Sequence, residues 1–415
     1  MRCEKSLSFS VVVFVCVALT ATFAFAQAGA PRARLGTRQF RKTAPAQASA
    51  AAAVAAAPAV PGLPLWSFHV VSDRDGNDYT GVMVGTSPFN HGSGDTRVAT
   101  QIVPIIFKTH TIGTILRPNG IVATRPGDTT FNSTVSDPAC LGSRNNNPLR
   151  LFQQSPIIQS ADFNYGGTDV GRTQTTDAFQ RASFWRVINR EDYHVRLGPT
   201  TTFSPIVVDV PAASGLALAT TSLGPPAFCA PMAVVDINFF DLFINNNILP
   251  ALAPHGVNHG TFPIFFLYNA VMSFGDPRDI ANNCCILGYH GIGNNDPTQT
   301  YSPMNFDSTG LFGIGGLDIA TATHEVAEWM NDPFGNNPTP PWGHTGQVPG
   351  CQNNLEVADP LSGTEAPRII MPNGYTYHLQ EMAFFSWFFS ARSVGVGGWF
   401  SNNGTFLTSA GPPCQ

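Results

Sequence analysis

Runs of apolar and alternating residues predict β-strands along much of the chain. Residues 66–71 and 79–85 flank a turn that contains Asp75 and Gly76, which is the pattern of a β-hairpin. Residues 102–107 and the aromatic, β-branched run 262–273 have the composition of buried strands. We expect further strands at 193–197, 204–210 and 286–292, and a second hairpin within 369–380.

Three segments have helical character. In 175–188, Ala178, Phe179, Ala182 and Trp185 fall near one helical face. Residues 234–249 form a long apolar run that ends in asparagines, and 318–331 ends just before Pro333, which cannot continue a helix. Strands and helices together predict a mixed α+β fold with a central β-sheet, rich in loops.

The first 62 residues differ in composition from the rest of the chain. A basic start, an apolar run and the small residues Ala24 and Ala26 predict a signal peptide over 1–26. Residues 27–62 are rich in Ala and Pro, so we expect a disordered linker or pro-segment that cannot form a core. Residues 63–415 then form a single large domain, secreted to the periplasm or the cell exterior and free of the membrane once the signal is cleaved.

The charge balance argues against polyanionic partners. Seven of the 22 basic residues and one of the 27 acidic residues lie at or before Lys42, which leaves 15 basic against 26 acidic residues. The remaining chain therefore carries a formal charge of about −11, which is unfavourable for binding nucleic acid or an anionic membrane.

Six cysteines remain after the predicted signal peptide: Cys140, Cys229, Cys284, Cys285, Cys351 and Cys414. An even number in a secreted chain predicts three disulfides, with fifteen possible pairings. No C-x-x-C pair occurs, so a zinc site built on thiolates is not expected.

The sequence HEVAE at 324–328 is the main candidate for chemistry. Residues i and i+4 share a helical face, so His324 and Glu328 can ligate one metal ion. Glu325 lies about 100° further round the helix, where a general base can take a proton from an activated water molecule. The motif differs from H-E-x-x-H because a glutamate replaces the second histidine. An isolated H-E-x-x-E sequence also occurs by chance in many proteins, and on an ordinary helix Glu325 and Glu328 would form a solvated face.

A catalytic zinc site needs a third protein ligand. Glu356 and Asp359 follow the helix at a distance that lets the loop fold back, and the sequence does not decide between them. His344 and His378 are reserve candidates. One histidine with two carboxylates would neutralise a divalent ion, so the site would suit Zn²⁺ but equally Ca²⁺ or Mn²⁺. We expect His290 to be a strand or loop histidine with a local partner.

HEVAEWMNDPF followed by LEVADPL resembles the H-E-x-x-E…E-x-x-D arrangement of secreted, zincin-like bacterial proteins classed as metallopeptidases. The chain is more weakly similar to the plant EXORDIUM or phosphate-induced proteins, through DGNDYTGVMVG and CCILGYHG. The resemblance implies an extracellular or wall-associated protein with a metallopeptidase-like core. It does not imply peptidase activity, since some members of the family have lost the metal residues.

These observations predict a secreted metal-dependent hydrolase of the zincin type that acts on peptide or protein substrates. His324, Glu328 and either Glu356 or Asp359 would bind the ion, Glu325 would be the base, and Trp329 or Phe334 would line the cleft. The alternative is a binding protein with a structural or relic metal site. A third hypothesis is a carbohydrate hydrolase that uses Glu325 or Glu328 with Asp359.

Overall fold

The structure is a computed structural model that describes residues 62–90, 94–113, 124–143, 145–190, 192–219, 228–343, 351–409 and Cys414. The predicted signal peptide, nearly all of the predicted linker and His344 lie outside the described residues. The described residues belong to one compact unit of the chain, Pro31–Gln415. They form a mixed fold of helices and strands, as the sequence pattern predicts.

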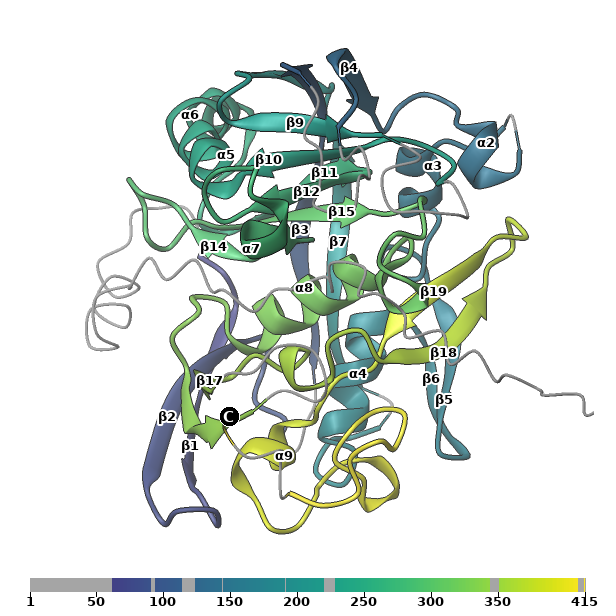
Figure 1. Ribbon diagram of the computed structural model, residues 1–415. Helices are drawn as coiled ribbons and strands as arrows, with labels where there is room; N and C mark the ends of the chain where they lie inside the picture. The colour runs from purple at the N-terminus through teal and green to yellow at the C-terminus, as the bar shows by residue number, and fades with distance from the viewer. Residues whose placement is uncertain are drawn as a thin grey trace, which may run out of the picture. The chain divides into compact units, whose positions relative to one another are not determined.

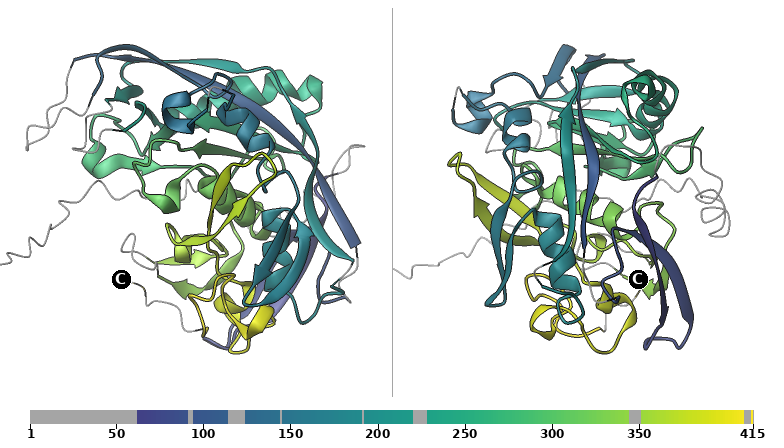
Figure 2. Two further views of the ribbon diagram at one scale, coloured as in Figure 1. Left: turned by 90° about the vertical axis from the view of Figure 1, so that its right-hand side faces the viewer. Right: turned by 180° about the vertical axis from the view of Figure 1, so that it is seen from behind.

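The central sheet is built around the long strand β3 (Gly94–Thr111). On one side β3 pairs in parallel with β11 (Phe262–Tyr268), and on the opposite side with β7 (Tyr193–Thr202) and then β8 (Ile206–Val210). Figure 2 shows the long strands β3 and β7 side by side over much of the height of the unit. The sheet is completed by β15 (Thr300–Phe306), β14 (Gly291–Ile292) and β4 (Gly127–Asn132).

A second sheet starts where the predicted strand 262–273 divides in two. Asn269 has a φ of 46°, a left-handed conformation that asparagine tolerates better than most residues, and it separates β11 from β12 (Ala270–Ser273). The order in this sheet is β13 (Cys284–Ile286), β12, β10 (Met232–Asp236) and β9 (Gly215–Leu218). Among the described residues, four two-stranded antiparallel sheets complete the strands: β1 (Leu65–Val71) with β2 (Asp78–Val84), β5 (Ala161–Tyr165) with β6 (Thr168–Thr173), β16 (Pro338–Trp342) with β17 (Gln352–Asn354), and β18 (Glu365–Ile370) with β19 (Thr376–Gln380).

The helices are short, apart from α8. Their bounds are α2 (Pro138–Leu141), α3 (Pro148–Gln153), α4 (Thr175–Ser183), α5 (Ile237–Phe243), α6 (Leu249–Leu252), α7 (Ile280–Asn283), α8 (Ala320–Asn331) and α9 (Phe385–Phe389). A π-helical turn (Ile244–Ile248) joins α5 to α6, and 3-10 turns lie at Ala253–His255, Ile314–Gly316, Asp359–Leu361 and Val396–Gly398. The helix predicted over 234–249 is therefore wrong at its start, because β10 occupies Met232–Asp236 and the helix begins at Ile237.

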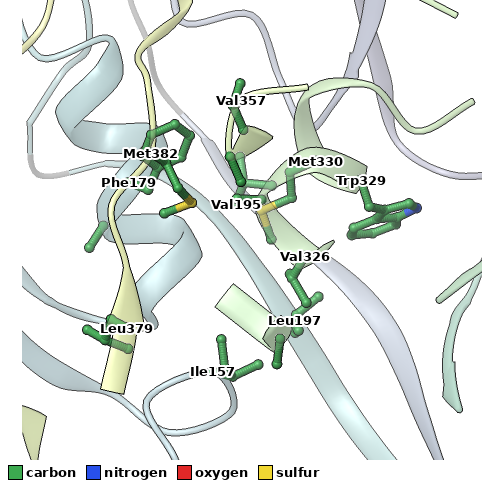
Figure 3. Packing of buried hydrophobic residues seen from close by; sticks show 14 of the residues in the cluster. Ile157, Phe179, Val195, Leu197, Val326, Trp329, Met330, Val357, Leu379 and Met382 are labelled. Atoms are coloured by element: carbon green, nitrogen blue, oxygen red, sulfur yellow. The ribbon is translucent and has the colours of Figure 1, made fainter. Parts of the chain in front are cut away.

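Helix α8 lies below the central sheet in Figure 1, with the hairpin of β18 and β19 beside it. Its apolar side packs into the largest hydrophobic cluster, where Val326 and Met330 lie among Val195, Val357 and Met382 (Figure 3). Every residue of α8 is buried, so the helix is out of contact with water along its whole length.

Trp329 anchors α8 to the central sheet. Its ring stacks on Phe262, with ring centroids 3.7 Å apart, and its indole Nε1–H donates to Thr300 Oγ1 at 2.9 Å. Trp329 is fully buried and Phe334 is 7% exposed, so the expectation that these rings line an open cleft is wrong. Trp329 holds the helix in place instead.

The six cysteines pair as Cys140–Cys229, Cys284–Cys285 and Cys351–Cys414. Disulfides persist in oxidising compartments, so these pairs fit a secreted or extracellular protein. Within the described part of the chain, no helix has the length and apolar character needed to cross a membrane.

Candidate metal centre

His324 and Glu328 lie on the same face of α8, as their spacing predicts. His324 Nε2 is 3.0 Å from Glu328 Oε2, and both side chains are buried. The 3-10 turn that starts at Asp359 brings a third group to the same nitrogen, since Asp359 Oδ1 lies 3.3 Å from His324 Nε2. Of the two carboxylates that the sequence leaves open, Asp359 is therefore the one that faces His324.

The other atoms of these three side chains are held by hydrogen bonds. Gln380 Nε2 donates to the carbonyl of Ala358 at 2.8 Å, which turns its Oε1 toward His324. His324 Nδ1–H donates to that oxygen at 3.0 Å. Its Nε2 therefore carries a lone pair in the neutral ring, directed at the two carboxylates. Metal-binding histidines are commonly oriented by such a second hydrogen bond.

The two carboxylates are fixed in the same way. The backbone N–H groups of Ala358 and Asp359 donate to Glu328 Oε1 at 3.3 and 3.1 Å. Gln352 Nε2 donates to Asp359 Oδ2 at 2.8 Å, and Ser362 Oγ to Asp359 Oδ1 at 3.3 Å. His324 and Glu328 thus each have one atom held by neighbours and another in the contact at His324 Nε2, whereas Asp359 Oδ1 takes part in both kinds of contact.

His324 Nε2 has no hydrogen-bond partner among the described residues, although it is buried and close to two carboxylates. A neutral imidazole nitrogen and a carboxylate are both acceptors, so their approach needs a cation between them or a proton on the ring. Burial acts to lower the pKa of His324, but Glu328 and Asp359 outweigh it and raise that pKa well above its ordinary value. The donor set of one imidazole and two carboxylates fits a divalent metal ion.

Glu325 lies next to His324 and Glu328 but makes neither of the two short contacts at His324 Nε2. Glu325 is 2% exposed, and its side chain lies against the backbone of Gly288. A Cβ atom at Gly288 would be 2.7 Å from Thr321 Cγ2 and 2.8 Å from Glu325 Cγ, so a larger residue here would displace side chains of α8. The segment between β13 and β14 thus packs closely against α8 at Glu325, the residue predicted to act as a base.

His290 belongs to the same buried cluster, so the expectation that it has only a local partner is wrong. Its Nε2–H donates to the carbonyl of Asp332 at 2.9 Å, while Nδ1 lies 3.9 Å from Glu325 Oε2. Its Nε2 is also 3.9 Å from Glu356 Oε2, so the partners are not local in sequence. Burial acts to lower the pKa of His290, but the Glu325 and Glu328 carboxylates outweigh it and raise that pKa.

Glu356 faces His290 rather than His324. Asn354 Nδ2 donates to Glu356 Oε1 at 2.5 Å. The possible ligand atoms of His290, Glu328 and Glu356 lie within 4.8 Å of one another, as do those of His324, Glu325 and Glu328, so Glu328 is common to both groups. Burial first, and then the neighbouring Glu328 carboxylate, raise the pKa of Glu356 well above its usual range.

The cluster holds more acid than base. Four buried carboxylates meet two imidazoles here: Glu325, Glu328, Glu356 and Asp359 against His290 and His324. Burial raises the pKa of Glu328 to about 7 and that of Asp332 to about 6. Uncompensated carboxylates are costly in a buried site, so the cluster favours binding of cations or protons.

His378, the reserve candidate among the described residues, does not join the cluster. Its Nδ1 lies 2.6 Å from Asp318 Oδ2, and its backbone N–H donates to Asp318 Oδ1. Asp318 precedes α8, so His378 braces the start of the helix, and the expectation of His378 as a reserve metal ligand is wrong.

No family model, curated protein sequence or solved structure matched the chain in comparisons with known proteins.

Proposed function

We propose that this protein is a secreted, metal-dependent hydrolase with a zincin-like core, acting on peptide bonds. The observation that carries the proposal is His324 Nε2, a buried nitrogen without a hydrogen-bond partner that faces the Glu328 and Asp359 carboxylates at 3.0 and 3.3 Å. Zn²⁺ is the ion that we expect, since His and carboxylate ligands are typical of zinc hydrolases. Ca²⁺ and Mn²⁺ remain the alternatives that a carboxylate-rich set would accept.

In this proposal the residues have separate roles. His324, Glu328 and Asp359 would hold the ion, which supplies Lewis acidity and lowers the pKa of water. Glu325 would accept a proton on its carboxylate, and Gly288 gives it room against the strand segment. His290 Nδ1 lies 3.9 Å from Glu325 Oε2, beyond hydrogen-bond distance, so His290 would act on this carboxylate through its charge.

The test of this proposal is cleavage of a mixed peptide library by the zinc-loaded protein and by Glu325→Gln. Gln keeps the size of the side chain but is not a base, so we expect a fall in rate of about 10²-fold or more with unchanged zinc content. If Glu325→Gln cleaves as fast as the wild type, the assigned mechanism is wrong.

A second candidate function is a secreted binding protein whose ion is structural. It is favoured by the burial of the cluster, in which Glu325 is 2% and Asp359 1% exposed, since structural metal sites are closed. This candidate predicts that chelation lowers the thermal stability while the peptide library stays uncleaved. Cleavage by the zinc-loaded wild type would contradict it.

A further inference from the structure

The buried cluster contains a second group of possible metal ligands besides the one built on His324. This group consists of His290, Glu328 and Glu356, whose possible ligand atoms lie within 4.8 Å of one another. The three residues come from the segment between β13 and β14, from α8, and from the segment before the 3-10 turn at Asp359. The fold therefore assembles a second set of one imidazole and two carboxylates, which are donor types that divalent ions accept.

His290 has one ring nitrogen available for an ion. Its Nε2–H donates to the carbonyl of Asp332 at 2.9 Å, so Nδ1 carries a lone pair in the neutral ring. Nδ1 lies 3.9 Å from Glu325 Oε2. This separation is too long for a hydrogen bond, but two atoms that each lie about 2.0–2.6 Å from one ion can be this far apart. His324 is arranged in the same way, with one ring nitrogen in a hydrogen bond and the other toward carboxylates.

Glu356 is oriented toward His290 by a neighbouring amide. Asn354 Nδ2 donates to Glu356 Oε1 at 2.5 Å, and the other oxygen, Oε2, lies 3.9 Å from His290 Nε2. The side chains of Glu356 and His290 are only 4% and 6% exposed. An ion bound between them would be held by the protein rather than by bulk water.

Glu328 can serve both groups because a carboxylate offers about four lone-pair positions. The backbone N–H groups of Ala358 and Asp359 use the two positions on Oε1, and the contact with His324 uses one on Oε2. One position on Oε2 is left for a second ion. Carboxylates that bridge two ions are a common way to build a two-metal site, in which the ions lie about 3.5–4 Å apart.

The charge of the cluster also favours two ions over one. Its four carboxylates carry four negative charges when ionised, and its two imidazoles carry none when neutral. One divalent ion would leave two of these charges uncompensated in a buried site, whereas two divalent ions would balance all four. Uncompensated buried charge is costly, so the second ion removes an unfavourable electrostatic energy.

We propose that the cluster binds a second divalent cation at His290, Glu328 and Glu356, next to the ion at His324. The inference goes beyond the proposed function, which needs one ion, but rests on its metal centre because both ions share Glu328. Repulsion between the two cations makes the second ion the weaker one, so the purified protein would retain one zinc and take up the second ion when it is added. The second ion would supply the positive charge beside Glu325 that protonated His290 supplies in its absence.

The experiment is titration of the zinc-loaded protein with Mn²⁺, in which free Mn²⁺ is counted from its EPR signal. Protein ligands bind Zn²⁺ more tightly than Mn²⁺, so the added ion should leave the zinc at His324. Glu356→Gln removes a ligand and one buried charge while keeping the size of the side chain. Glu365→Gln is the control, because Glu365 pairs with Arg368 and lies outside both groups. We expect about one Mn²⁺ per chain in the wild type and the control, and an affinity weaker by about tenfold or more in Glu356→Gln with unchanged zinc content.

The wild type loaded with manganese alone tests the same inference without a variant. Two Mn²⁺ ions about 3.5–4 Å apart should give the EPR spectrum of a spin-coupled pair. A spectrum of uncoupled ions, no Mn²⁺ binding by the zinc-loaded wild type, or equal Mn²⁺ binding by the wild type and Glu356→Gln would overturn the second site. Zinc content is measured in each sample, so a protein that holds zinc but fails these tests refutes only the second ion. A wild type that binds no zinc refutes the metal centre of the proposed function, and the shared pair with it.

Discussion

Gln380 orients the histidine of the candidate metal centre, and replacing it with methionine tests that role. Methionine has a similar length but cannot accept from His324 Nδ1–H or donate to the carbonyl of Ala358. Both groups are buried, so the substitution leaves one donor and one acceptor without a partner.

The structure gives the size of two separate effects. An orphaned buried polar group costs about 1–3 kcal/mol, so Gln380→Met should lower the free energy of unfolding of the metal-free protein by about 2–6 kcal/mol. Loss of a hydrogen bond that orients a metal ligand typically reduces metal affinity about 10–100-fold, which corresponds to about 1.4–2.8 kcal/mol.

The assay is competition for zinc against a chromophoric chelator, together with urea unfolding of the metal-free protein. Gln174→Met is the matched control. Gln174 is also a buried glutamine, and its amide donates to the carbonyls of Ile158 and Leu197 at 2.9 Å, in contacts that do not include the cluster. The control should lose stability but keep the zinc affinity of the wild type.

The reasoning would be refuted if Gln380→Met bound zinc as tightly as the wild type. Equal losses of zinc affinity in Gln380→Met and Gln174→Met would also contradict it, because general destabilisation would then explain the result.

Two further predictions concern stability. Burial raises the pKa of Asp307 from 3.8 to about 6, so the folded state holds this proton more tightly than the unfolded state. The free energy of unfolding should therefore fall by about 3 kcal/mol as the pH rises through that range. Urea unfolding below and above the range should show a smaller loss for Asp307→Asn, and an unchanged pH dependence in this variant would show the assignment to be wrong. Trp329→Ala removes the ring stacked on Phe262 and should lower the free energy of unfolding by about 3–5 kcal/mol. The half-buried Trp185 gives a control, and equal losses for Trp185→Ala and Trp329→Ala would argue against α8 being anchored by Trp329.

Local patterns in the sequence predicted those features that depend on neighbours along the chain. The Asp75-Gly76 turn and its apolar flanks gave the hairpin of β1 and β2, and the i,i+4 spacing placed His324 and Glu328 on one face of α8. The predicted start of the helix after β10 was wrong because apolar residues continue on both sides of Asp236, and periodicity alone cannot separate a buried strand from a buried helix there.

The rest of the candidate site depends on contacts between distant segments. Gln380 is 56 residues from His324, and Glu356 lies 66 residues from His290. The choice between Glu356 and Asp359 depends on how a 3-10 turn rotates one carboxylate toward His324 and leaves the other at His290. The motif could suggest a third ligand in this loop, but a single sequence holds no signal for its orientation.

The central claim is that His324, Glu328 and Asp359 bind a metal ion. The most direct measurement is elemental analysis of the purified protein, with Glu328→Ala compared with Glu365→Ala. Glu365 is a suitable control because its carboxylate pairs with Arg368 in the β18–β19 hairpin and is not part of the cluster. We predict about one zinc per chain in the wild type and in Glu365→Ala, and none in Glu328→Ala. Equal metal content in Glu328→Ala and the wild type, or no metal in any of the three, would contradict the account.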